Sequence, residues 1–169
     1  MATYLDRILS DHRSAAAVDT RSLDGLMDLA RSRPAVRGFG AALRGGAGNE
    51  PAIIAEVKRR SPSRGDLVAD LDPAETASQY VLGGATCISV LTDADHFGGS
   101  VEDLTRAREA VTVPVLRKDF TIDSRDVCDA RIMGADAVLL IASALDDAEL
   151  VDHHALALEL GLDALVEVH

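Results

Sequence analysis

The chain has 169 residues, 47% of them hydrophobic, so it is long enough to bury the core of one ordinary domain. This composition excludes long disorder, and the longest nearly apolar run, residues 137–145, is far shorter than the roughly 20 residues of a membrane span. The net charge of −11 argues against a general nucleic-acid binder. Because the first residues also lack the apolar region of a signal peptide, we expect a cytoplasmic protein with no membrane partner.

The charged residues are unevenly chosen. Of the 28 acidic residues 20 are Asp, and of the 17 basic residues 15 are Arg, which leaves Lys58 and Lys118 as the only lysines. An acidic, lysine-poor surface is typical of proteins that work in high salt, although biased base composition would produce the same preference for Arg. The two cysteines, Cys87 and Cys128, lie in apolar or helical patterns with no CxxC partner, so we expect buried free thiols.

Helical patterns come first along the chain. Residues 4–17 and 22–31 have the spacing of amphipathic helices, and Arg33-Pro34 ends the second. The glycine-rich stretch 45–49 precedes a strand rather than following one, so it is interpreted as a flexible connector and not as a dinucleotide loop. Residues 1–48 are therefore predicted to form an N-terminal helical extension.

From residue 53 onward, short apolar runs alternate with helical patterns, which is typical of strand and helix units around a parallel sheet. The first helix has Asp72 as N-cap before Pro73 and ends at residues 83–84. The next begins near Ser100, a third begins at residue 123 or 124 and ends at Gly134, and a fourth spans residues 146–161. The five predicted strands are residues 53–57, 87–91, 113–116, 137–141 and 164–168.

The spacing of these strands is near that of a (β/α)8 barrel, which needs eight units and about 250 residues. Periodicity alone also allows an open doubly wound sheet. The last residue, His169, directly follows an apolar strand, a place where a domain seldom ends. The architecture of residues 49–169, with strands one to five, therefore stays open between these two α/β folds, and we expect the sequence to stop short of the whole fold.

Both lysines lie where parallel strands end, which is where α/β proteins bind ligands. An amine can lose its charge when it is buried, whereas a guanidinium cannot, so two lysines kept at two strand ends suggest proton transfer at Lys58 and Lys118. Glu56 and Glu167 lie inside apolar strand runs, and they either complete a proton-transfer set or form structural salt bridges. Asp119 faces the opposite way from Lys118 along the strand and is expected to be structural.

Other candidate sites are weaker. Residues 58–64 are basic, but they lack interleaved aromatic residues and belong to an acidic chain, so nucleic-acid binding is disfavoured. His153 and His154 are adjacent on a helix rather than four residues apart, so no metal site is expected. Phe97 and Phe120 follow strands two and three and could either wall an aromatic ligand or pack in loops.

The segments PAIIAEVKRRSPSRGDL, ISVLTDADHFGGS, PVLRKDFTIDSRDV, GADAVLLIASAL and ALVEVH, in this order and spacing, closely resemble the indole-3-glycerol phosphate synthase family of tryptophan biosynthesis. The resemblance runs from the N-terminal helices to residue 169. It implies a (β/α)8 TIM barrel with an N-terminal helical segment, and no cofactor or metal. The implied reaction converts 1-(2-carboxyphenylamino)-1-deoxyribulose 5-phosphate, an anionic phosphorylated small molecule, to indole-3-glycerol phosphate with loss of carbon dioxide and water.

The same resemblance assigns roles to individual residues. Lys118 is similar to the general acid that protonates the ribulose carbonyl, and Lys58 to the lysine near the substrate carboxylate. Glu167 and Glu56 resemble the acids that move protons during dehydration and hold lysine and substrate in place. The resemblance leaves open which lysine performs the second proton transfer. The positions that match the lining of the substrate pocket are Ser61, Pro62, Phe97, Phe120 and Leu139.

One large part of the family pattern has no counterpart in these residues. The family continues through strands six to eight, including an Asn and an Arg after strand six and the phosphate-binding loops after strands seven and eight. The sequence therefore allows two hypotheses. The first is a lyase site, and the second is a noncatalytic fragment that assembles with a complementing C-terminal half-barrel.

Overall fold

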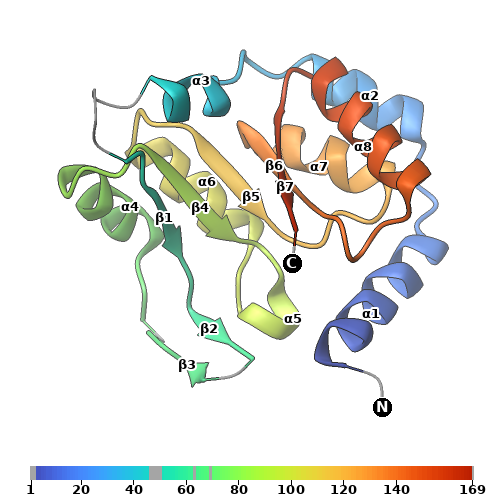
Figure 1. Ribbon diagram of the computed structural model, residues 1–169, viewed down its shortest axis with the longest axis horizontal. Coiled ribbons are helices and arrows are strands. Elements are labelled where there is room, and N and C mark those ends of the chain that lie inside the picture. Colours follow the sequence, from blue (N-terminus) through green and yellow to red (C-terminus); the bar gives the residue numbers. More distant parts are fainter. Residues whose placement is uncertain (1–2, 46–50, 63, 69, 169) are drawn as a thin grey trace.

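The structure, a computed structural model, describes residues 3–45, 51–62, 64–68 and 70–168. Five parallel strands form its main sheet in the order β1-β4-β5-β6-β7 (Figure 1). The strands are β1 (Ile54–Val57), β4 (Cys87–Leu91), β5 (Val115–Lys118), β6 (Ala137–Ile141) and β7 (Asp163–Glu167). Their number and order agree with the sequence prediction, and the parallel α/β arrangement is that of a partial TIM barrel.

Three strands differ from the predicted bounds, the first only in that it begins at Ile54 rather than at residue 53. The third begins at Val115 rather than at residue 113, because Pro114 has no N–H to donate to the ladder. Pro114 still accepts a hydrogen bond through its carbonyl from the Ile88 amide, at 2.9 Å. The fifth begins one residue early at Asp163, whose carboxylate accepts from the Gly40 amide at 2.9 Å. The shift of the third strand makes Lys118 the last residue of its strand.

The helices that follow these strands begin at the predicted caps. Asp72 accepts from the Ala74 and Glu75 amides, and the two later N-caps Asp123 and Asp146 each form a capping box. The helices are α4 (Pro73–Leu82), α6 (Val101–Ala110), α7 (Ser124–Met133) and α8 (Asp147–Glu159). Their apolar faces and the outward residues of the strands form the larger core, which buries Ile88, Val90 and Val138.

Three helices precede the sheet: α1 (Tyr4–Val18), α2 (Leu23–Arg31) and α3 (Phe39–Arg44). The first two match the predicted helices, and Ser22 is the N-cap of α2. Helix α2 packs on α7, and α3, which the sequence reading missed, places Phe39 in the core of the inner face. Of the predicted connector 45–49, residues 46–49 lie outside the described part of the chain.

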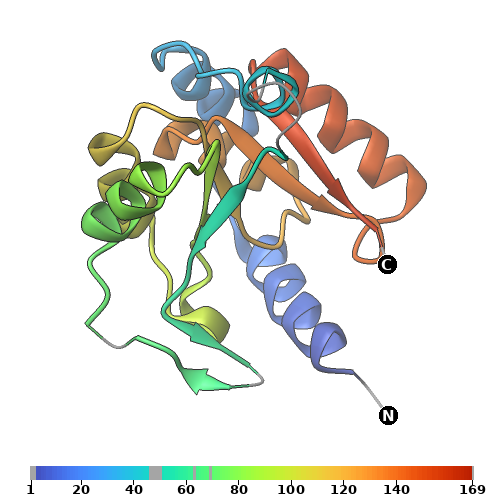
Figure 2. The same ribbon diagram turned by 60° about the vertical axis from the view of Figure 1, so that its left-hand side comes forward.

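Two further elements were not predicted. A short antiparallel hairpin, β2 (Arg60–Ser61) with β3 (Gly65–Asp66), follows β1, and the four-residue helix α5 (Ala94–Phe97) follows β4. The hairpin, α5 and α1 gather at the end of the sheet opposite α3 (Figures 1 and 2). That end is the carboxyl end of the parallel strands, where ligand sites of this architecture are found.

Burial confirms the prediction for the cysteines: Cys87 and Cys128 are free and buried. Burial also raises the pKa of each thiol to about 11, so both are protonated at neutral pH. In the described part of the chain, no helix combines the length and apolar character that crossing a membrane requires.

Candidate active site

Strand periodicity decides which side chains share the inner face of the sheet. Successive side chains point to opposite faces, so Lys118, at the carboxyl end of β5, shares a face with the core residue Leu116. On β6 the same alternation places Leu139 on this face, and on β7 it places Leu165 and Glu167 there. On β1, Glu56 follows Ile54 on the inner face and pairs in register with Ser89. All four predicted proton-transfer residues therefore lie on or next to the inner face of the sheet, at the carboxyl end of its strands.

These four residues form two lysine–glutamate pairs. Lys118 Nζ, at the end of β5, lies 3.6 Å from Glu167 Oε2, at the end of β7, although β6 separates these two strands in the sheet. Lys58 Nζ donates to Glu56 Oε1 on the same strand end. All four side chains are about 30% exposed, so each charge is shielded from bulk water by its surroundings yet accessible to a ligand. The structure thus places each glutamate beside a lysine. This arrangement is compatible with a proton-transfer set and with structural salt bridges.

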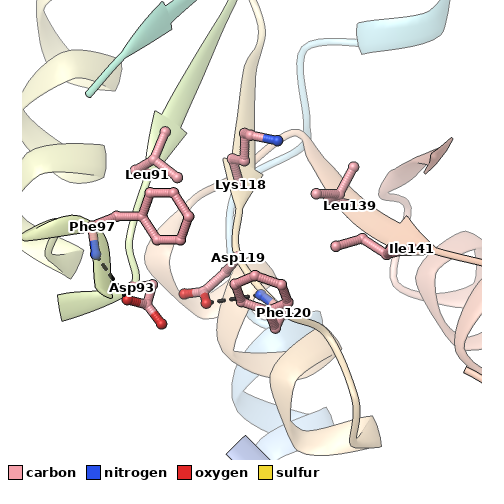
Figure 3. A pocket seen from close by; sticks show the side chains of 8 residues that line it. All are labelled: Leu91, Asp93, Phe97, Lys118, Asp119, Phe120, Leu139 and Ile141. Atoms are coloured by element: carbon pink, nitrogen blue, oxygen red, sulfur yellow. Dashed lines mark hydrogen bonds between the residues drawn. The ribbon is translucent and has the colours of Figure 1, made fainter. Parts of the chain in front are cut away.

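A pocket opens beside Lys118. The space between its walls, counted together with adjoining open solvent, is about 260 Å³. Figure 3 shows Leu91 and Phe97 on one side of Lys118 with Leu139 and Ile141 on the other. The rings of Phe97 and Phe120 are tilted by 38° with centroids 6.3 Å apart. Aromatic and aliphatic walls of this kind suit a flat aromatic ligand, with an ammonium group at the edge to meet its polar atoms.

Three of the five predicted lining residues, Phe97, Phe120 and Leu139, surround this pocket. The other two do not: Ser61 is the last residue of β2 and Pro62 is in the turn of the hairpin. Leu91 and Ile141 were missed, although alternation along their strands places them on the same face as Leu139. Strand period is therefore the sequence signal that could have found them.

Asp119, which was expected to be structural, lies in a buried ion pair and also lines the pocket beside Lys118. Its carboxylate accepts from Arg117 Nη2 at 3.0 Å and from the Thr92 hydroxyl, and both charged side chains are less than a tenth exposed. The Phe120 amide donates to its other oxygen at 2.8 Å. This buried pair fixes the chain directly after Lys118.

Among the residues that the structure describes, one group could hold a metal ion. His12, Asp93 and Asp119 offer ligand atoms that all lie within 4.8 Å of one another, an arrangement that the sequence reading missed because His12 lies 81 residues before Asp93. Each carboxylate is already engaged, however. Asp119 pairs with Arg117, while Asp93 binds the His12 ring and two amides.

The indole-3-glycerol phosphate synthase family model matches residues 5–169. The chain belongs to the indole-3-glycerol phosphate synthase family. This is a family of TIM-barrel carboxy-lyases of tryptophan biosynthesis that act on a phosphorylated small molecule, and the fold and the resemblance expected from the sequence are confirmed.

Proposed function

We propose that this chain supplies the acid–base half of an indole-3-glycerol phosphate synthase site, acting on 1-(2-carboxyphenylamino)-1-deoxyribulose 5-phosphate. The observation that carries the proposal is the Lys118–Glu167 pair, 3.6 Å apart, beside a pocket walled by Phe97 and Phe120. The family match supports the reaction class. The pocket's apolar walls suit the carboxyphenyl ring, and the ammonium group suits the adjacent carbonyl oxygen.

In the proposed chemistry, Lys118 protonates the ribulose carbonyl while the ring carbon that carries the carboxylate attacks the carbonyl carbon. Loss of carbon dioxide restores the aromatic ring, and loss of water completes the indole. Lys58 attracts the substrate carboxylate, and Glu167 and Glu56 move protons in the dehydration and hold the lysines in place. Positioned acids and bases of this kind contribute roughly 10² to 10⁴ in rate each.

The helices before β1 fit the same proposal. We infer that residues 1–48 form an N-terminal extension and residues 49–169 the first five units of the barrel. Free buried thiols are typical of a reducing compartment, which supports a cytoplasmic location.

A second candidate is a noncatalytic half that needs a complementing C-terminal part. The observation in its favour is that β1 and β7 are the edges of the described sheet. Edge strands present unpaired backbone groups that recruit another chain. The substrate's phosphate would then be held by the partner, because the family's phosphate loops follow strands seven and eight.

Replacing Lys118 tests the proposed acid. In a barrel completed by a C-terminal half, Lys118→Ala should lower turnover by roughly 10² to 10⁴ and change substrate affinity much less, because the other basic groups still attract the anion. Lys118→Arg is the matched control for charge, and it should also be slow, because a guanidinium does not give up its proton. If the alanine variant keeps more than half of the turnover, Lys118 is not the acid.

A further inference from the structure

His12 connects the N-terminal helix α1 to the carboxyl end of the sheet. Its Nε2 lies 2.9 Å from Asp93 Oδ2 and 4.0 Å from Asp119 Oδ1. The two carboxylates are almost fully buried, with side chains 3% and 5% exposed, while the histidine is 23% exposed. The contact is therefore a largely buried link between segments far apart in sequence.

The carboxylate that binds His12 also fixes the backbone of a pocket residue. Asp93 is the N-cap of α5, and its Oδ1 accepts from the His96 amide at 2.6 Å and from the Phe97 amide at 3.1 Å. A displacement of Asp93 would therefore move the start of α5 and with it Phe97, which lines the pocket.

The His12 ring contacts the other aromatic wall directly. Its centroid lies 5.3 Å from that of Phe120, with the planes tilted by 48°. Phe120 in turn packs against Phe97. His12 thus contacts Phe120 through its ring and is linked to Phe97 through Asp93, but it does not line the pocket itself.

A second tie holds the same helix against α5. Tyr4 Oη lies 3.2 Å from His96 Nδ1, and His96 Nε2 lies 3.4 Å from the Asp11 carboxylate. Helix α1 therefore contacts α5 at two separate points, so the orientation of α5 depends on the helix as well as on its own cap.

We propose that His12 is a positioning residue that sets the aromatic wall formed by Phe97 and Phe120. Its effect on catalysis rests on the proposed function, because the wall is the surface that would hold the carboxyphenyl ring against Lys118. Small misplacements of a bound ring are costly in rate, so loss of His12 should lower kcat/KM by roughly 10- to 100-fold. The loss should fall mainly on kcat, because the anionic groups of the substrate still bind.

The chain offers a probe that needs no turnover. Phe39, Phe97 and Phe120 are its three phenylalanines, so fluorophenylalanine labelling gives three ¹⁹F resonances. In His12→Ala, the Phe97 and Phe120 resonances should shift, and that of Phe39, in the core at the other end of the sheet, should stay in place. The exposed His154 provides the matched control, and His154→Ala should move none of the three.

A conservative variant separates the two contacts of His12. His12→Gln keeps a side-chain N–H donor for Asp93 but loses the ring, so the Phe97 resonance should stay near its original position while that of Phe120 shifts. It also keeps the test decisive if His12→Ala fails to fold. Each spectrum is recorded with and without EDTA, which removes any metal at His12, Asp93 and Asp119, and a response that vanishes with EDTA would contradict the proposal.

The result that would overturn the proposal is a folded His12→Ala variant with unmoved Phe97 and Phe120 resonances, or a His12→Gln variant whose Phe97 resonance shifts as far as in the alanine variant. These signals are independent of the proposed function. If the resonances respond as expected in a chain whose completed barrel converts no substrate, the synthase proposal fails and the positioning role stands.

Discussion

Glu167 has two possible roles at the level of a single residue, proton transfer and a structural ion pair with Lys118. Glu167→Gln preserves size and packing but removes the exchangeable charge, so we expect an unchanged circular dichroism spectrum and a large loss of turnover in the completed barrel. Both measurements are made on the same preparation. An unfolded variant whose residual folded fraction is fully active would favour the structural role instead.

The histidine that ties α1 to the sheet makes stability depend on pH. The hydrogen bond with Asp93 raises the pKa of His12 above its ordinary 6.5, and burial opposes this rise only in part, while Asp119 and Asp126 add to it. Burial disfavours the charge on Asp93, but the hydrogen bonds from His12 and the His96 amide lower its pKa overall. The pair is thus oppositely charged at mildly acidic pH.

A raised pKa in the folded state stabilises the protein below the unfolded-state pKa, and this stabilisation is lost as the pH rises through the folded value. The difference in unfolding free energy between the original chain and His12→Ala should therefore be larger at about pH 5.5 than at about pH 8.5. Denaturant unfolding at the two pH values measures it. A difference that grows with pH would contradict the charge assignment, and His154→Ala should show no such trend.

At the level of elements, the long periodic segments could be predicted and the short ones could not. The helices with Asp72, Asp123 and Asp146 as N-caps begin where their caps indicate, because a cap is a local signal. The hairpin β2–β3 has two residues a strand, too few to show alternation, and α5 has a single turn. Those elements exist because tertiary contacts hold them, such as the hydrogen bond that Arg60 donates to the Asp95 carbonyl within α5.

The same division holds for the candidate site. Lys58, Lys118, Glu56 and Glu167 could be found from the sequence because they are polar residues at the ends of apolar runs. His12 could not, because nothing near it in sequence marks an exposed-looking helix position as the partner of Asp93, 81 residues away. Contacts across such separations follow from the packing of α1, which periodicity alone does not determine.

The turn after α5 provides an element-level test. Gly99 packs so closely against the end of β4 that an added Cβ would overlap the carbonyl oxygen of Leu91. Gly99→Ala should therefore displace the loop between β4 and α6 and lower stability by about 1–3 kcal/mol, measured by thermal unfolding. Gly83→Ala is the matched control, since its Cβ would make ordinary contacts at 3.4 Å. Equal effects of the two changes would contradict the tight approach.

At the level of the whole molecule, the described sheet is open, with β1 and β7 at its edges. Open edges and uncovered apolar side chains, among them Ile53, Val166 and Val168, favour association with another chain. We expect the 169-residue chain alone to self-associate in a concentration-dependent way, detected by analytical ultracentrifugation. Addition of a C-terminal half-barrel should replace these self-contacts with a defined complex. A monodisperse monomer at all concentrations would contradict the expectation.

The most direct measurement is the formation of indole-3-glycerol phosphate by the chain alone and after mixing with a C-terminal half-barrel of the same family. Positioning a substrate can contribute several kcal/mol to lowering a barrier, so Lys118 and Glu167 without a grip on the phosphate should give no measurable turnover. Mixing should restore turnover. A mixture with the Lys118→Ala chain should reach about a hundredth of that turnover or less. Turnover by the unaided chain, or equal turnover with the original and Lys118→Ala chains in the mixture, would contradict the assignment of the acid–base half to these residues.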